Sequence, residues 1–244
     1  MMSYDDLLEL ARARRTIRGF KKDQDVPEDL VKRILEVARF APSGGNSQPW
    51  EFIVIRDSGM RERIAELFLK QAAEKHEMDM AIRGTAKLTG AGFRNAPVYI
   101  LVLGDPRVNE AFPIRTREDK AQSHFITGLA SATLLIHLAA TSLGLASQWV
   151  SDASSPYMST MLRAWLGIPE PLRVYDMVPI GYPVRVPPAT PRRPLAELIH
   201  QDRYDQGRYR NEEQIKAFIG TATLQGSFGR SAKEADEMGI ETRT

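Results

Sequence analysis

The sequence predicts a single α+β domain in which short buried strands alternate with longer helices. Three short apolar segments are predicted to be core strands: WEFIVI from residue 50, VYILVLG from residue 98 and VYDMVPIGYP from residue 174. The segments between them include stretches with the apolar spacing of helices. The chain has 244 residues, which is enough to bury a substantial core, and it shows neither internal repeats nor a linker between two cores. We therefore expect one domain.

The N-terminal part of the chain contains two predicted helices and the first strand. Ser3 followed by Asp6 resembles a capping box, so a short helix is expected to begin there. Pro27 and the acidic residues after it form a helix start, because proline is preset for the first helical turn and acids suit the helix dipole. This second helix should end at Ala41-Pro42. A polar loop then leads into the first strand, which ends at Arg56.

The middle of the chain is expected to contain three helices and two less regular segments. A charged helix is predicted over about 60–80, and glycine and polar residues predict an exposed excursion over 85–95. Residues 105–118 carry prolines and mixed charge and are predicted to be a loop or lid. A long apolar helix is expected over about 126–145, ending at a glycine C-cap, and a last helix over about 156–167.

The C-terminal part of the sequence is more polar. After Pro183 the chain is rich in proline and arginine, and from about Thr221 it has little apolar content. We expect the domain to cover residues 1–220 and a polar tail to cover 221–244.

Composition excludes several classes of function. The net charge of +2 is too small to favour nucleic acid or an anionic membrane, so neither is expected as a partner. The chain contains no cysteine, which excludes disulfides, thiol catalysis and iron–sulfur clusters. The remaining classes are those that need neither thiols nor a strongly charged surface.

Two segments could act as targeting or membrane signals. The first residues lack the basic region and the long apolar stretch of a signal peptide. The segment from Ile126 to Leu145 approaches the ~20 apolar residues of a membrane span. It contains Ser131 and His137 and has no flanking basic cluster, so a buried core helix is the better interpretation. We expect a cytoplasmic protein.

Common nucleotide, metal and nucleophile motifs are absent from the sequence. No G-x-G-x-x-G follows a predicted strand, and no G-x-x-x-x-G-K-[ST] occurs. Four histidines are scattered without metal-ligand spacing, and no serine is paired with a histidine and an acid in a known arrangement. We therefore expect no metal site and no catalytic side chain of these types.

Two groups of arginines remain as candidates for phosphate binding. Arg14, Arg15 and Arg18 lie together after the first predicted helix, and Arg192 and Arg193 are adjacent late in the chain. A guanidinium suits a phosphate dianion because it supplies charge and paired hydrogen-bond donors at once. For any one of these arginines taken singly, a solvated basic surface is the favoured interpretation.

The loop SGGNSQPW is the other unusual segment. Its two adjacent glycines permit close backbone approach, while Asn46 and Gln48 supply donors and acceptors beside a tryptophan. This combination suits the edge of a heteroaromatic ring with carbonyls and ring nitrogens. A plain turn would explain the glycines, but less easily the whole string.

Taken in order, several segments resemble the nitroreductase family of flavoproteins. They are RRTIRGF, APSGGNSQPW running into EFIVI, GLAS with a tryptophan after it, VPIGYP and RRPLAEL. The resemblance extends from about Tyr4 to Ile199, and APSGGNSQPW is its most specific element. It implies a mixed sheet flanked by helices, a homodimer with a long central helix in its interface, and a C-terminal arm that embraces the partner. The arm would cover about 195–220, with Tyr204, Tyr209, Ile215 and Phe218 as anchors.

The resemblance also implies FMN as the cofactor and assigns its contacts. Residues of the RRxxR element and the late basic pair would bind the phosphate, and the glycine-containing loop would reach FMN in part across the dimer interface. The implied FMN-binding residues are Arg14, Arg15, Thr16 and Arg18; Pro42, Ser43, Gly44, Asn46 and Gln48; Gln148, Trp149 and Val150; Ile180 and Gly181; and Arg192 and Arg193.

The implied activity is a ping-pong transfer of electrons. NADH or NADPH would give a hydride to flavin N5, and a nitroaromatic, quinone or similar acceptor would then take the electrons. Flavin N5 carries this chemistry, so no catalytic side chain is required. The positive charge of Arg14 and Arg18 is expected to stabilise the anionic reduced flavin.

The acceptor is the least determined part of this hypothesis. Segments 70–95 and 105–124 are the expected lid, in which Phe93, Phe112 and His124 are candidate substrate contacts. A solvated loop would explain the same residues. Reductive dehalogenation, flavin fragmentation and enone reduction occur in related branches and remain alternatives, as do a non-catalytic FMN-binding module and a flavin-free phosphate- or nucleotide-binding protein.

Overall fold

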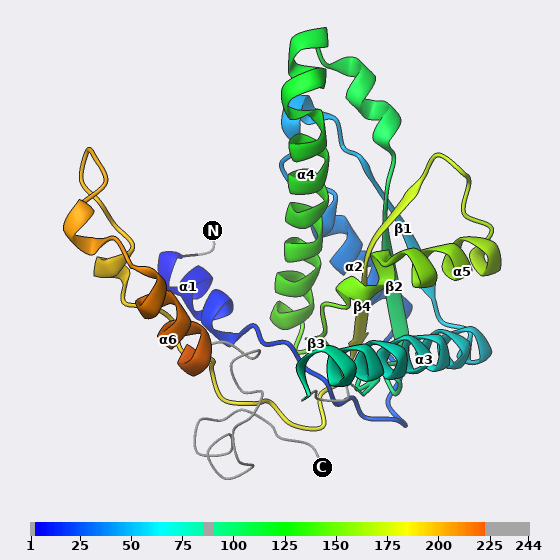
Figure 1. Ribbon diagram of the computed structural model, residues 1–244. Helices are drawn as coiled ribbons and strands as arrows, with labels where there is room; N and C mark the ends of the chain where they lie inside the picture. Colours follow the sequence, from blue (N-terminus) through cyan, green and yellow to red (C-terminus); the bar gives the residue numbers. More distant parts are fainter. Residues whose placement is uncertain (1–2, 85–89, 223–244) are drawn as a thin grey trace. The chain divides into compact units, whose positions relative to one another are not determined.

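The chain folds into two compact units, each described here by itself. The computed structural model describes residues 3–84 and 90–222. Of these, residues 3–74 and 90–186 form the first unit, and residues 75–84 and 187–222 form the second. The helices are α1 (Tyr4–Ala13), α2 (Glu28–Ala38), α3 (Ser58–Arg83), α4 (Ile114–Ser142), α5 (Pro156–Leu166) and α6 (Glu212–Ala222), and the strands are β1 (Trp50–Ile55), β2 (Val98–Gly104), β3 (Ala146–Ser147) and β4 (Arg173–Gly181) (Figure 1). Short 3-10 turns are η1 (Gly44–Asn46), η2 (Pro106–Ala111), η3 (Ser151–Ser154), η4 (Leu195–Glu197) and η5 (Gln206–Arg208).

The first unit is organised around a four-stranded sheet with the order β1-β2-β4-β3. All three ladders of this sheet are antiparallel. The parallel pairing of the expected mixed sheet is found as an isolated bridge between Thr16 and Ser147. Around this sheet the predicted combination of α-helices and short strands is confirmed.

Strand β2 is buried on both faces and separates two hydrophobic cores. Tyr99, Leu101 and Leu103 face a core that also contains side chains of α3 and α5. Alternate residues of the same strand face a second core with side chains of α2 and α4. Because successive strand residues point to opposite faces, the continuous apolar run VYILVLG predicts this three-layer arrangement.

Helix α4 begins twelve residues before the start predicted at Ile126. It starts at Ile114 after Pro113, so much of the segment 105–118, predicted to be a loop or lid, belongs to η2 and α4. The first turns of α4 are polar and largely exposed, and an apolar pattern detects only the buried part of such a helix. By length and composition α4 could cross a membrane, but half of its most apolar window is buried within the structure.

Other element boundaries are close to the predicted ones. Helix α2 ends at Ala38 rather than at Pro42, and α3 extends three residues beyond the predicted end. Gly144 follows α4 with a φ of 72°, as expected for a glycine C-cap. Strand β3 was not predicted, because two residues carry no periodic pattern.

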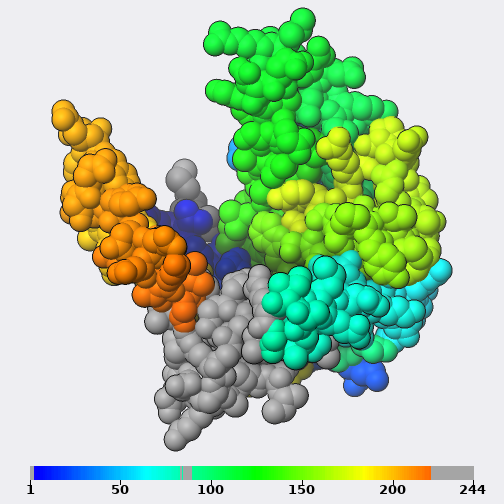
Figure 2. All heavy atoms as spheres, viewed as in Figure 1, coloured from blue at the N-terminus to red at the C-terminus, as the bar shows by residue number. Residues whose placement is uncertain are grey.

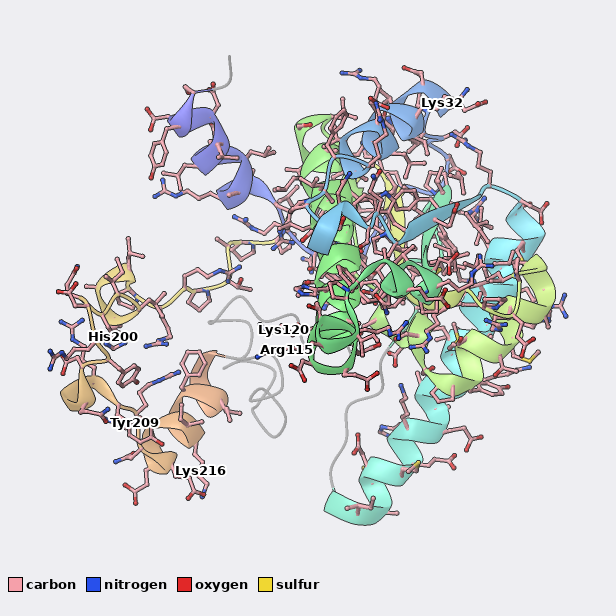
Figure 3. The ribbon with its side chains drawn as sticks, turned by 90° about the horizontal axis from the view of Figure 1, so that it is seen from above. Lys32, Arg115, Lys120, His200, Tyr209 and Lys216 are labelled. Carbon is pink, nitrogen blue, oxygen red and sulfur yellow. The ribbon has the colours of Figure 1, made fainter. Side chains whose placement is uncertain are left out.

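The second unit contains the segment expected to form an arm. His200 stacks on Tyr204 with ring centroids 4.2 Å apart, and the Arg210 guanidinium lies 4.9 Å from the Phe218 ring centroid. Figure 3 shows His200, Tyr209 and Lys216 on this segment. Whether it embraces a partner stays a prediction, and the expected polar tail lies outside the described residues beyond position 222.

Candidate functional site

The basic segment after α1 is attached to strand β3 through its backbone. Arg14 caps the C-terminus of α1, and its N–H donates to the Leu10 carbonyl at 3.1 Å. Two residues later Thr16 pairs with Ser147, and the Ile17 N–H donates to the Ser147 carbonyl at 3.0 Å. Strand β3 therefore determines where the predicted phosphate-binding arginines lie.

The same strand brings the predicted ring-lining residues to this place. Ser147 is paired with Ile180, and the residue before it with Gly181. The Gln148 N–H then donates to the Pro179 carbonyl at 3.2 Å, and Val150 is bridged to β4. The structure thus brings the segments 14–18, 148–150 and 180–181 together. The side chains of Val150 and Ile180 are buried in the two cores, so these residues can offer a ligand only their backbone.

Beside these segments, the predicted Trp149 lies close to three polar residues that sequence reasoning missed, His137, Ser147 and Asp176. The Nδ1 atom of His137, on α4, lies 2.7 Å from Ser147 Oγ. The imidazole ring stacks on the indole of Trp149, with centroids 5.4 Å apart and an interplanar angle of 24°. The Trp149 Nε1–H donates to Asp176 Oδ2 at 2.7 Å. We call His137, Ser147, Trp149 and Asp176 the Trp149 cluster.

Burial shifts the pKa values of the two titratable groups in this cluster in opposite senses. Burial, together with the smaller effect of the nearby Arg14 cation, lowers the pKa of His137 to about 4. It raises the pKa of Asp176 to about 6, although the hydrogen bond from Trp149 acts against this shift. At neutral pH the imidazole is therefore uncharged, while the carboxylate is mainly ionised.

Three buried polar atoms in this cluster and the adjoining segments have no hydrogen-bond partner among the described residues. They are His137 Nε2, Gln148 Oε1 and Arg15 Nε. A buried polar group without a partner costs about 1–3 kcal/mol, so such atoms are uncommon unless a ligand or water completes them. Together with the arginines, these atoms fit a polar ligand that also carries an anionic group.

The loop SGGNSQPW forms a second candidate region with a fixed backbone shape. Gly45, Asn46 and Gln48 all have positive φ values, of 57°, 55° and 45°. The Gln48 N–H donates to Ser43 Oγ at 3.0 Å, which closes the turn, and Pro42 precedes it as an exposed residue. Positive φ is costly for residues other than glycine. The loop therefore holds Asn46 and Gln48 in a backbone conformation that an ordinary turn does not require.

This loop packs against two of the three predicted substrate contacts. A Cβ atom on Gly44 would lie 2.7 Å from His124 Cγ, and one on Gly45 would lie 3.0 Å from Phe112 Cε1. The rings of Phe112 and His124 are 5.4 Å apart. Both side chains are half-buried, so each keeps some surface open to a ligand.

Phe93, the third predicted substrate contact, is instead a core residue. It is 0% exposed and packs edge-on between Phe68 and Tyr99, at centroid distances of 5.1 and 5.5 Å. Its neighbour Arg94 forms an ion pair with Glu62. The flanking glycine and arginine suggested an exposed loop, but the aromatic ring is large enough to anchor that loop in the core.

The two candidate regions lie far apart within one chain. His124 at the loop and His137 in the Trp149 cluster are thirteen residues apart on α4. At 1.5 Å per residue this separation is about 20 Å along the helix. Arg115 and Lys120 lie at the N-terminal end of α4, toward the loop (Figure 3).

The outward face of α4 between these regions presents mainly apolar groups, because its hydroxyl groups are hydrogen-bonded within the helix. Ile126 and Leu134 are 42% and 46% exposed. The Thr127 hydroxyl donates to the Ser123 carbonyl, and the Ser131 hydroxyl to the Thr127 carbonyl, each at 2.8 Å. Their hydrogen-bonding capacity is used within the helix, which leaves methyl and methylene groups outward. Figure 2 shows atoms of this region, in green, at the surface of the chain.

The late arginine pair belongs to the second unit. Arg192 donates to Thr190 Oγ1 at 2.6 Å, and Arg193 pairs with Glu197 at 3.4 Å. That this pair joins the segment 14–18 in one phosphate site stays a prediction.

Comparison with known proteins supplies a family. The sequence model of the Nitroreductase family matches residues 11–182. A protein of Archaeoglobus fulgidus, provisionally named NADH dehydrogenase/NAD(P)H nitroreductase, is 31% identical over 179 residues, covering 73% of this chain and 86% of its own length. The iodotyrosine deiodinase of Nematostella vectensis is 28% identical over 202 residues, covering 77% and 72%. Among solved structures, an FMN-dependent nitroreductase of Clostridium difficile has a TM-score of 0.61 at 22% identity, over 81% of this chain and 99% of that one.

Proposed function

The chain belongs to the nitroreductase family, and on that premise we propose that it is an FMN-dependent oxidoreductase. It takes electrons from NADH or NADPH and passes them to a nitroaromatic, a quinone or a similar acceptor. The names of its relatives support this proposal: one includes NAD(P)H nitroreductase, and a structural neighbour is an FMN-dependent nitroreductase.

The observation that carries the cofactor assignment is the pair of unpartnered buried atoms beside the basic segment. His137 Nε2 and Gln148 Oε1 lie in the region where Arg14 and Thr16 are attached to β3. FMN combines a phosphate with a ring and a ribityl chain rich in donors and acceptors, which matches this donor set. Arg14 and Arg18 would bind the phosphate, Arg15 and Thr16 would add local contacts, and Gln148 and its neighbours would face the ring.

The cofactor and the surrounding residues have different roles in the proposed reaction. When bound, FMN supplies a ring that accepts a hydride and passes electrons on. The arginines place positive charge near the ring system, which favours its reduced anionic form. Trp149 and Gln148 would exclude water from one side of the site, and the loop 42–48 of a second subunit would close another side.

We further propose that the working form is a homodimer with the site between subunits. The loop and the Trp149 cluster are about 20 Å apart in one chain. A single ligand can contact both more easily when the loop comes from one subunit and the cluster from the other. An antiparallel pair of α4 helices achieves this with a twofold axis near residues 130–131, because His124 and His137 lie equally far from that point. The apolar outward face of α4 supplies the surface that such a pair would bury.

A second candidate activity is reductive dehalogenation of an aromatic substrate. It is favoured by the iodotyrosine deiodinase among the relatives. Phe112 and His124, whose rings lie side by side at the loop, are suitable contacts for an aromatic acceptor in either activity.

Colour and rapid kinetics test the proposal. The purified full-length protein should be yellow or take up added FMN, and a colourless protein that fails to bind FMN would overturn it. Stopped-flow reduction with NADH and NADPH, followed by reoxidation with nitroaromatics, quinones, an enone and 3-iodotyrosine, then ranks donors and acceptors. FMN uptake without any turnover would instead indicate a non-catalytic binding module.

A further inference from the structure

Trp149 has an unusually restricted backbone for a residue that remains partly open to solvent. Its neighbours on both sides are hydrogen-bonded to β4. The Gln148 N–H donates to the Pro179 carbonyl at 3.2 Å, and the Val150 N–H donates to the Met177 carbonyl at 2.9 Å. The Met177 N–H returns a bond to the Val150 carbonyl at 3.3 Å. The Cα–Cβ direction of Trp149 is therefore set by the sheet.

The face of the Trp149 ring is fixed by His137. The two rings are nearly parallel, and His137 is 2% exposed, so it cannot turn away into solvent. Its own ring is oriented by Ser147 Oγ, 2.7 Å from Nδ1. Burial keeps this imidazole neutral, because it lowers the pKa of His137 to about 4. A neutral ring can stack on an indole without bringing a charge into the core.

The edge of the Trp149 ring is fixed by Asp176. The indole Nε1–H donates to Asp176 Oδ2 at 2.7 Å, within the range of a charge-assisted hydrogen bond. Asp176 is 4% exposed, and burying a carboxylate is costly. A neutral acceptor would satisfy the indole at lower cost, so the carboxylate provides directional strength beyond what packing requires.

Despite these three restraints, Trp149 is 38% exposed. The residue before it, Gln148, has a buried Oε1 without a partner among residues 3–84 and 90–222. A rigid, partly open planar surface is suited to stacking by a planar ring. Because its rotamer is already fixed, Trp149 would lose little conformational entropy when such a ring binds.

We propose that His137 and Asp176 are positioning residues that fix Trp149 as a rigid wall for the aromatic ring of the flavin. Neither residue need touch the flavin, and both act through the indole. The inference rests on the proposed function for the identity of the ligand, while the restraint of Trp149 stands on the geometry of this chain.

Full-length protein carrying single substitutions tests this proposal, with FMN as the probe. Asp176→Leu removes the acceptor and Asp176→Asn retains a neutral one, while His137→Leu removes the stacked ring. Trp149→Phe identifies the near-ultraviolet circular dichroism and fluorescence of Trp149. Trp165→Phe is the matched control, because Trp165 packs under Arg63 against the other core. Spectra are recorded before and during an FMN titration, and thermal unfolding shows that each variant is folded.

Asp176→Leu should abolish the dichroism band assigned to Trp149 and weaken FMN binding roughly tenfold, as expected for loss of a hydrogen bond to a charged group. Asp176→Asn should retain most of both signals, and Trp165→Phe should bind FMN as the wild type does. Such rescue by the conservative variant separates positioning from a general effect on folding. If Asp176→Leu does not fold, His137→Leu provides the same comparison, with loss of the band and weaker binding expected.

The proposal is overturned if wild-type protein binds FMN and the folded leucine variants keep both the Trp149 band and wild-type affinity. Failure of the proposed function gives a different result, since the wild-type protein then takes up no FMN. In that case the flavin assignment falls as well, whatever the spectra of Trp149 show.

Discussion

Thr16 and Ser147 pair in a parallel bridge that joins the basic segment after α1 to strand β3. The contact is made by backbone groups, including the Ile17 N–H that donates to the Ser147 carbonyl. This backbone pairing therefore places the segment that carries Arg14 and Arg18. Substituting these side chains should change ligand binding more than it changes the fold.

Arg14→Ala and Arg18→Ala should each weaken FMN binding roughly ten- to hundredfold, because each removes a charged donor from the expected phosphate site. The potential of the bound flavin should become more negative, since less positive charge stabilises its reduced form. Fluorescence titration with FMN and a spectroelectrochemical measurement check both effects.

Arg39→Ala serves as the control for the arginine variants. Arg39 is an exposed arginine at the C-cap of α2 that pairs with Glu36, so its loss lowers the net charge equally without removing a predicted FMN contact. Unchanged FMN affinity and flavin potential in both Arg14→Ala and Arg18→Ala would show that the phosphate assignment is wrong.

Gly44→Ala should lower the free energy of unfolding by about 1–3 kcal/mol, as overpacking does in a closely packed site. The added Cβ would lie 2.7 Å from His124 Cγ, so loop or helix must shift. FMN binding should weaken as well if the loop contributes to the site. Urea unfolding and FMN titration measure the two effects.

Gly90→Ala is the matched control, because no atom of residues 3–84 or 90–222 lies within 4 Å of the position a Cβ would take there. Its stability should stay within about 0.5 kcal/mol of the wild type. Equal stability of the two variants would mean that the close approach of Gly44 to His124 does not occur in solution.

The pH dependence of stability should reveal the opposed titrations of His137 and Asp176. The pKa of His137 falls from 6.5 to about 4 on folding, so below pH 6.5 the unfolded chain takes up the proton first and acidification destabilises the fold. The pKa of Asp176 rises from 3.8 to about 6, so from pH 6 down to 3.8 the folded chain takes up the proton and acidification stabilises it. Between pH 4 and 6 the two effects oppose each other.

Removing either titratable group should leave the effect of the other on the pH dependence of stability unopposed. Relative to the wild type, Asp176→Asn should lose stability more steeply on acidification from pH 6 to 4, and His137→Leu less steeply. The slopes should differ from that of the wild type by at most about 1.4 kcal/mol per pH unit, the value for one proton. Urea unfolding at several pH values gives these slopes, and parallel curves for all three proteins would contradict the assignment.

The proposed α4 interface can be tested by engineered disulfides, because the chain has no cysteine of its own. Ser131→Cys lies next to the proposed twofold axis, so the two copies should come close enough to form a disulfide on mild oxidation. A disulfide requires Cα atoms within about 7 Å. Non-reducing gel electrophoresis should show mainly linked dimer.

Ser123→Cys is the control for cross-linking. Ser123 is on the same helix but lies about 11 Å along it from the axis, so its two copies should be roughly 22 Å apart. Cross-linking at residue 123 but not at residue 131 would place the axis elsewhere. A monomer in sedimentation analysis of the wild type would remove the interface altogether.

Local patterns predicted the elements whose burial is uniform or simply periodic. The run VYILVLG became the central strand, and the apolar part of α4 and its glycine cap were found where expected. The polar first half of α4 was missed, because an exposed helical segment carries no apolar stripe. Phe93 was placed in a lid because its sequence neighbours are polar, whereas its burial depends on Phe68 and Tyr99, which lie elsewhere in the chain.

The sequence by itself determined the segments that carry the family's chemistry: the arginines from residue 14, the loop with Asn46 and Gln48, and the stretch from Gln148. Only the tertiary structure decided which of these segments meet. It added His137 and Asp176 to the site and separated the loop from it by about 20 Å along α4. The physical reason is that periodicity and turn chemistry are local, whereas contact between α4, β3 and β4 depends on how two cores pack against one sheet.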